Sequence, residues 1–181
     1  IKLVEFASLT CSHCAEFAEA SAVELAETFV ASGRVSYEFR NFVRDPIDIT
    51  AAQLVRCAPP EAFFALTDQV LAFQPALFEN WQKAGEAQLK AIDTLPVEKR
   101  GLGIAQAAGL TDFFATRGIS RDQAATCLAD PAKAQDLARR TEAQSKQFDI
   151  TGTPTFVING SKVQGNTWAE IKPLLENAGA R

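Results

Sequence analysis

The sequence predicts an α/β protein whose βαβ…ββα core carries an all-helical insertion. Three observations predict this fold. The first 42 residues have the pattern strand, helix, strand; residues 48 to 148 contain no convincing strand; and the residues after 150 return to two short strands and a helix. We therefore expect residues 1–47 and 146–181 to form the core and residues 48–145 to form the insertion.

The amino-terminal segment predicts two strands joined by a helix. The stretch IKLVEFA (1–7) is short, apolar and followed by the polar SLTC, as expected of a buried strand. From residue 11 to about residue 31, apolar side chains recur at intervals of three and four, which is typical of a helix, and Gly33 marks its end. The alternating, aromatic-rich RVSYEFRNF (34–42) predicts the second strand, so we expect a right-handed βαβ unit.

The insertion is predicted to consist of several helices. Two of them have clear start signals: Ser120 with Gln123 fits a capping box, and Asp130 caps a helix that begins with Pro131. The predicted helical segments are AAQLVRCA, PEAFFALTDQVLAF, ALFENWQKAGEAQLKAI, PVEKRGLGIAQAAG, DFFATRG, SRDQAATCLA and PAKAQDLARRTEAQSKQFD.

The carboxy-terminal segment predicts a hairpin followed by a helix. TFVING and KVQG have strand character, and the Asn159-Gly160 pair between them is a strong signal for a hairpin turn. TWAEIKPLLENAG predicts the closing helix, which Thr167 caps with Glu170 three residues later. We expect Pro173 to kink or shorten this helix.

Size, composition and charge limit the classes of function. The 181 residues are 47% hydrophobic, enough for a sizeable core without cysteine cross-links. The net charge is −4 and basic residues occur in no run longer than a pair, which argues against nucleic acid and anionic membrane surfaces as partners. No apolar run reaches the ~18 residues that a membrane span needs, so we expect no stable membrane insertion. Because the chain lacks Met and starts within a strand, we expect its natural start and any signal peptide to have been removed.

The segment TCSHC (10–14) contains two of the four cysteines and the only histidine. A Cys-x-x-Cys pair at the start of a helix that follows a strand is typical of a redox motif. The helix N-terminus favours an anion, so we expect a lowered pKa and a reactive thiolate at Cys11. Cys14 lies one turn later on the apolar stripe and should be less exposed, and His13 would further stabilise the Cys11 thiolate.

Two alternatives to a redox pair remain for this segment. A structural zinc site needs four ligands, usually supplied as two close pairs, and the chain has one histidine and no second Cys-x-x-Cys motif. The thiols could also be inert members of a core. A second signal favours the redox interpretation: TGTPTF places Pro154 at the head of a strand, either as an ordinary strand start or as a cis-proline loop packed against the Cys11–Cys14 pair.

These motifs resemble those of DsbA-type thiol:disulfide oxidoreductases, which have a thioredoxin-like fold with a helical insertion. LVEFASLTCSHC, TGTPTFVING and the intervening helices extend this resemblance over nearly the whole chain. It implies that Cys11 is the nucleophile, Cys14 its buried partner and His13 a stabiliser of the thiolate. It also implies that Pro154 is the cis-proline beside which substrate backbone docks, and that Glu5 is a buried acid that moves protons at Cys14.

Two residues depart from the family pattern, and two cysteines lie outside it. Ser12 stands where proline commonly follows the first cysteine, and Thr153 where the best-known oxidases have valine; both changes bear on redox potential and substrate preference. Glu5 could instead reach an edge of the sheet and be solvated.

Cys57 and Cys127, each in a predicted helix, are expected to form a structural disulfide in an oxidising compartment. The alternative is that they are two lone buried thiols.

The resemblance implies an oxidase that donates the Cys11–Cys14 disulfide to secreted proteins through a mixed disulfide at Cys11, without a prosthetic group. We expect unfolded or reduced protein substrates, a membrane redox partner, a periplasmic or otherwise extracytoplasmic location, and a monomer. The alternatives are a reductase or isomerase of the same superfamily, although isomerases there usually carry a separate dimerisation domain. A non-catalytic binding or chaperone-like module would instead use the apolar segments PEAFFAL and DFFATRG.

Overall fold

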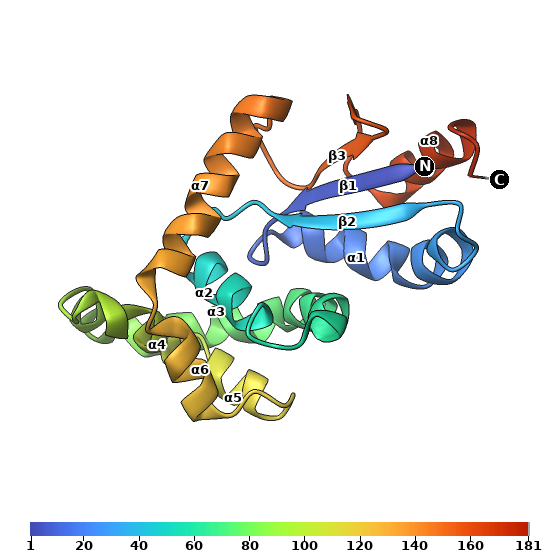
Figure 1. The fold of residues 1–181 in the computed structure, drawn as a ribbon. Helices are drawn as coiled ribbons and strands as arrows, with labels where there is room; N and C mark the ends of the chain where they lie inside the picture. The colour runs from blue at the N-terminus through green and yellow to red at the C-terminus, as the bar shows by residue number, and fades with distance from the viewer. Residues whose placement is uncertain (181) are drawn as a thin grey trace.

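The computed structural model describes residues 1–180 and contains a four-stranded sheet in the order β2-β1-β3-β4 (Figure 1). The inner strand β1 pairs in parallel with β2 and antiparallel with β3, the other inner strand, and β3 pairs antiparallel with β4. The strands are β1 (Lys2–Ala7), β2 (Ser36–Asn41), β3 (Thr155–Ile158) and β4 (Ser161–Val163). The predicted α/β fold class is therefore confirmed.

The alternating side chains of β1 give the sheet two apolar faces. Leu3 lies in a core cluster with residues of three helical segments, which are α1 (Ser12–Glu24), its π-helical continuation (Leu25–Val30) and α8 (Trp168–Asn177). Val4 and Phe6 point to the other face and pack with Phe148 and Ile150, at the end of α7 (Pro131–Phe148). Because alternate residues share a face, Glu5 points with Leu3 toward α1.

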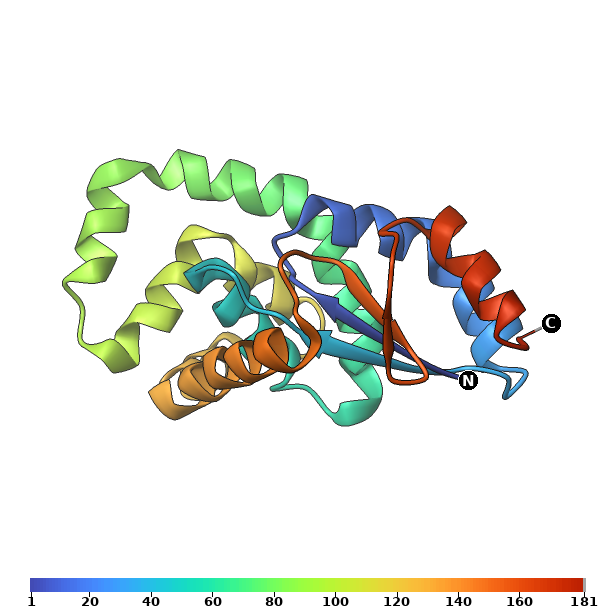
Figure 2. The ribbon, with the colours of Figure 1, turned by 90° about the horizontal axis from the view of Figure 1, so that it is seen from above.

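Six helices and a short 3₁₀ turn lie between β2 and β3 and form a second lobe beside the sheet (Figures 1 and 2). Besides α7, they are α2 (Pro46–Val55), the 3₁₀ turn (Pro60–Ala62), α3 (Phe63–Asp93), α4 (Val97–Ala107), α5 (Leu110–Ala115) and α6 (Arg121–Leu128). One buried cluster joins this lobe to Cys11 and Cys14. The helical lobe therefore shares a core with the start of α1. The division at residues 47/48 and 145/146 stays a prediction.

The break within α3 lies elsewhere than the sequence predicts. We expected two helices separated near Pro75, but α3 runs through that residue and turns sharply at Gly85, whose φ is 73° and ψ 163°. Buried Leu71 and Leu77 on either side of Pro75 hold both halves of the helix against one core. Gly85 can adopt the positive φ without steric cost. Packing thus outweighs the intrinsic cost of proline, and the chain bends where glycine permits.

The sequence signals at several element ends are confirmed. Ser120 and Gln123 form the capping box of α6, the Asp130 side chain accepts a hydrogen bond from the Ala132 N–H, and Asn159 and Gly160 both adopt positive φ. Pro173 neither ends nor shortens α8, which continues to Asn177. None of the described helices is long and apolar enough to cross a membrane.

Cys57 and Cys127 form a disulfide that joins the turn after α2 to helix α6. The expectation that Cys57 lies within a helix is wrong, because α2 already ends at Val55. The bridge is separated from the other two cysteines, which are free thiols.

Removing this bridge should lower the free energy of unfolding by about 4 kcal/mol, because it closes a loop between residues 70 positions apart. We expect this loss in denaturant unfolding of the double variant Cys57→Ala/Cys127→Ala. Peptide mapping should find the bridge intact after mild reduction that opens a Cys11–Cys14 disulfide. A variant as stable as the wild type, or free Cys57 and Cys127 thiols in protein from an oxidising compartment, would contradict the pairing.

Candidate active site

Cys11 and Cys14 lie at the start of α1, where β1 has ended at Ala7 and a short loop turns the chain back beneath the sheet. Cys11 is the residue before the helix, and Cys14 lies in its first turn. Cys14 is fully buried, and Cys11 retains 4% exposure. Cys14 is the less exposed of the two, as expected, but Cys11 is also recessed, because the loop before β3 lies against it.

That loop contains the Thr153–Pro154 peptide bond, which is cis. The Cys11 thiol donates a hydrogen bond to the Thr153 carbonyl oxygen at 3.2 Å, although the two residues are 142 positions apart. Pro154 is buried and directly precedes β3. The fold thus brings the two motifs TCSHC and TGTPTF into contact.

The two thiols of the pair have opposite pKa shifts. The pKa of Cys11 falls to about 5, mainly because the Cys14 thiol donates a hydrogen bond to the Cys11 thiolate. Burial opposes this shift, while a hydrogen bond from the Thr153 side-chain hydroxyl, one from the Cys14 N–H and the positive charge of Arg44 reinforce it. Burial raises the pKa of Cys14 far above its usual range, and the hydrogen bond to Cys11 raises it further. The pair therefore combines one thiolate with one neutral thiol.

His13 lies on the exposed surface of α1. Its Nδ1 is 3.0 Å from Glu16 Oε2, and the hydrogen bond with that carboxylate is the main cause of its raised pKa. The charge of Cys11 makes only the smallest contribution to that shift. Its role as a stabiliser of the thiolate stays a prediction, whereas Thr153 and Arg44 are placed to act on Cys11 directly.

Glu5 is 2% exposed and faces α1 from the centre of the sheet. The Tyr37 hydroxyl donates a hydrogen bond to its Oε2. Burial raises the pKa of Glu5 to about 8; the Tyr37 hydrogen bond opposes this shift, and the charges of Asp68 and Cys11 add to it. Near neutral pH this carboxyl is therefore mostly protonated and can both give up and take back a proton. Glu5 does not reach a solvated edge of the sheet.

The chain matches the model of the thioredoxin family over residues 1–177. It belongs to the thioredoxin family. A crystal structure of a protein-disulfide isomerase from Novosphingobium aromaticivorans is similar, with a TM-score of 0.90 and 35% identity over 98% of this chain and 91% of that one. Wolbachia pipientis alpha-DsbA1 has the same fold, with a TM-score of 0.71 and 21% identity over 97% of this chain and 84% of that one. The DsbA-like thioredoxin fold with a helical insertion is thereby confirmed.

Curated relatives of this thioredoxin-family chain are longer than it is. A Rickettsia bellii protein named "putative protein-disulfide oxidoreductase" is 24% identical over 98% of this chain but only 60% of its own length. A protein of the same name from Rickettsia conorii is 25% identical over 97% of this chain and 56% of its own length. The chain therefore spans a little over half of these relatives.

Two supports of this thioredoxin-family site were not found from the sequence. The carboxylate of Asp48 accepts hydrogen bonds from the Ser8 hydroxyl at 2.5 Å and from the Leu9 N–H at 2.9 Å. Gln74 Nε2 donates to the carbonyl oxygens of Leu9 and Cys11 at 2.9 and 3.0 Å. Both anchors come from the helical lobe and hold the loop before α1. Nothing near them in sequence marks them, because their partners lie 39 to 65 positions away.

The dithiol form should show one thiolate transition near pH 5, because only the Cys11 anion is stabilised. Thr153→Val should raise this pKa by about one unit, because it removes the side-chain hydroxyl whose hydrogen bond lowers the pKa of Cys11 and leaves the backbone carbonyl in place; a hydrogen bond to a charged group contributes ~1.5 kcal/mol. His13→Ala should raise it as well. Thiolate absorbance followed against pH measures these shifts, with the disulfide form as the blank. A single transition near that of free cysteine would contradict the assignment of Cys11 as the nucleophile.

Proposed function

We propose that this chain is a thiol:disulfide oxidoreductase of the DsbA type that acts as an oxidase, donating the Cys11–Cys14 disulfide to protein thiols. The observation that carries the proposal is the opposite shift of the two thiol pKa values, which lowers that of Cys11 and raises that of Cys14. A reactive thiolate beside a protonated thiol is the arrangement that exchange through a mixed disulfide requires.

The exchange proceeds in two displacements. A substrate thiolate attacks Cys11 Sγ, forms a mixed disulfide there and expels the Cys14 sulfur, which takes a proton from the Glu5 carboxyl. A second substrate thiolate then attacks the substrate sulfur of the mixed disulfide and releases the Cys11 thiolate. The substrate loses two electrons and gains a disulfide, the Cys11–Cys14 pair gains them as a dithiol, and solvent returns the proton to Glu5.

The stability of the Cys11 thiolate favours the oxidising direction. A thiolate of low pKa is a good leaving group in the second displacement and stabilises the reduced form, which makes the disulfide the stronger oxidant. An isomerase is the second candidate, favoured by the similar isomerase from Novosphingobium aromaticivorans. It would use the same attack by Cys11, but on substrate disulfides and from the reduced form.

Partners and location belong to the same proposal. Unfolded or reduced proteins are the substrates, and a membrane redox partner reoxidises the dithiol. The protein works as a monomer in the periplasm or another extracytoplasmic compartment, with Pro154 beside the docked substrate backbone. The Cys57–Cys127 disulfide supports this location, because such bridges persist in oxidising compartments.

Refolding of a reduced, unfolded substrate with the oxidised protein as sole oxidant tests the proposal. We expect fast disulfide formation with one substrate bond formed per protein molecule, and poor reduction of a stable disulfide by the dithiol form. A parallel reaction with a substrate carrying scrambled disulfides and the dithiol form separates the isomerase. Fast reshuffling with slow oxidation would support the isomerase, and fast reduction with slow oxidation would make the chain a reductase.

A further inference from the structure

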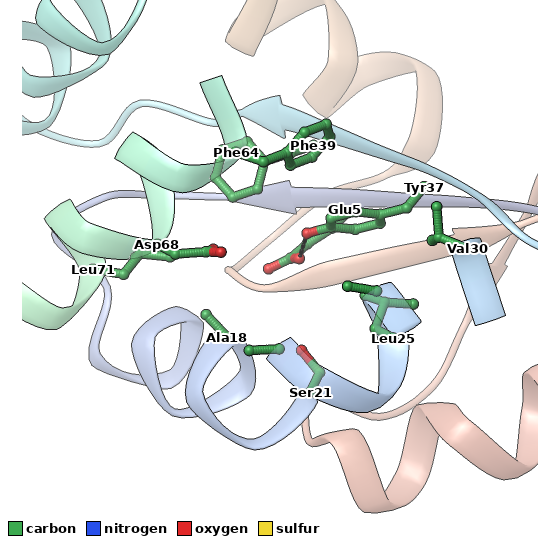
Figure 3. Close-up of a pocket in the computed structure, with 12 residues that line it drawn as sticks. Glu5, Ala18, Ser21, Leu25, Val30, Tyr37, Phe39, Phe64, Asp68 and Leu71 are labelled. Atoms are coloured by element: carbon green, nitrogen blue, oxygen red, sulfur yellow. Dashed lines mark hydrogen bonds between the residues drawn. The ribbon is translucent and has the colours of Figure 1, made fainter. Parts of the chain in front are cut away.

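A cavity of about 250 Å³ lies between the sheet, α1 with its π-helical continuation, and the start of α3 (Figure 3). Three aromatic side chains line it: Tyr37 and Phe39 from β2 and Phe64 from α3. The rings of Tyr37 and Phe64 are stacked at a tilt of 34° with centroids 5.4 Å apart. Phe64 is 44% exposed, so a large apolar side chain at the border of this cavity is accessible to solvent.

The polar groups of the cavity are acidic. Glu5 and Asp68 line it, and their carboxyl oxygens point toward each other across it (Figure 3). No Lys, Arg or His is among the residues that line it. Within the part of the chain that the structure describes, the Asp68 side chain has neither a hydrogen bond nor an ion pair, and the Glu5 side chain accepts a hydrogen bond only from Tyr37. Neither carboxyl group therefore has a positively charged side chain as a partner, although Asp68 is exposed to solvent and Glu5 is buried.

We propose that this cavity binds a small organic ammonium ion with an apolar body. A cation close to the faces of aromatic rings is attracted by their quadrupoles, and quaternary ammonium groups are recognised in this way. Asp68 supplies the opposite charge, Glu5 adds to it when it ionises, and Leu25 and Val30 supply apolar surface for the rest of the ligand. The volume is below that of sites for drug-sized molecules, so the ligand must be smaller.

The proposed site is separate from the Cys11–Cys14 pair but shares Glu5 with it. A bound cation favours the ionised form of Glu5, so binding and deprotonation of this carboxyl are linked. The titratable groups that face Glu5 are Tyr37 on β2, Asp68 on α3, and Cys11 and Cys14 at the start of α1. In the disulfide form the two cysteines do not titrate and Cys11 carries no charge, so burial is the main cause that raises the pKa of Glu5 into the range tested.

Isothermal calorimetry of the disulfide form with benzyltrimethylammonium tests the proposal, because this cation keeps its charge at every pH. We expect saturable binding at about millimolar concentration, as suits a ligand of this size. Benzyl alcohol, which lacks the charge, should bind at least tenfold more weakly. If the bound cation lowers the pKa of Glu5 by about one unit, affinity for the cation should rise about tenfold from pH 6.5 to 9.5. This rise should disappear in Glu5→Gln.

Two variants on α3 form a matched pair. Phe64→Leu removes a ring from the cavity, whereas Phe78→Leu removes one of similar exposure (39%) that does not line it. Phe64→Leu and Asp68→Asn should each weaken binding at least fivefold, and Phe78→Leu should leave it unchanged. Absent binding, equal affinity for benzyl alcohol, a flat pH profile in the wild type, or equal losses in the two phenylalanine variants would each overturn the proposal. Because calorimetry measures binding without any thiol–disulfide exchange, the result of this test does not depend on whether the proposed redox function is correct.

Discussion

Replacing Cys11 with serine is expected to reduce thiol–disulfide exchange by this protein to the background rate of the buffer. A serine hydroxyl is not ionised near neutral pH and cannot form the mixed disulfide on which both displacements depend. The fold should survive the change, because serine is close to cysteine in size and α1 needs no thiol to begin. The rate of substrate oxidation, measured beside circular dichroism of the same sample, checks both points.

Cys14→Ser is the matched control for this experiment. It keeps the Cys11 thiolate able to attack a substrate disulfide but removes the thiol that would resolve the intermediate. We expect this variant to accumulate a mixed disulfide at Cys11, visible by mass spectrometry under non-reducing conditions. Residual exchange in Cys11→Ser, or a mixed disulfide mapped to Cys14 in that variant, would show that the nucleophile is misassigned.

The second large effect concerns Glu5 and the stability of the fold. Its pKa is raised from 4.5 in the unfolded chain to about 8 in the folded protein, so the folded state binds this proton more tightly. The stabilisation is complete below pH 4.5 and is lost as pH rises through about 8. For a shift of this size the loss amounts to about 3 to 5 kcal/mol in the free energy of unfolding.

Denaturant unfolding of the disulfide form between pH 5 and 9 measures this loss, because Cys11 and Cys14 then do not titrate and only the small contribution of the Cys11 charge to the raised pKa of Glu5 is missing. Glu5→Gln is the reference, since a neutral amide of similar shape can accept the Tyr37 hydrogen bond at every pH. The wild type should become less stable than Glu5→Gln as pH rises toward 9. Asp48, with its pKa raised to about 6 by burial, contributes equally to both proteins and cancels. A constant difference between the two across this range would mean that Glu5 is not the buried proton donor.

Local signals in the sequence account for most of the fold. The short apolar run of β1, the capping box at Ser120 and the Asn159-Gly160 turn each act over a few residues, so they can be recognised without the tertiary structure. The path of α3 could not be predicted in this way. Whether a helix breaks at a proline or at a glycine depends on which part of the helix is packed against the core. Here the helix on both sides of Pro75 is packed against the core, so it continues through that residue.

The residues of the candidate site also fall into those that local sequence motifs predict and those that only tertiary packing determines. Short sequence motifs that indicate their chemistry contain Cys11, Cys14 and Pro154, and the fold brings these motifs together. Asp48 and Gln74 are ordinary polar residues of helices and acquire their roles only when those helices pack against the loop before α1. The depth of burial that sets the pKa of Glu5 also comes from tertiary packing and not from its neighbours in sequence.

The reduction potential of the Cys11–Cys14 couple tests the central claim most directly. Equilibration with glutathione buffers of known potential, with the dithiol fraction read by alkylation and mass spectrometry, gives its value. Because the Cys11 thiolate stabilises the reduced form, we expect a potential clearly less negative than the roughly −270 mV of thioredoxin. A potential at or below that value would contradict an oxidase and make this chain a reductant of disulfides.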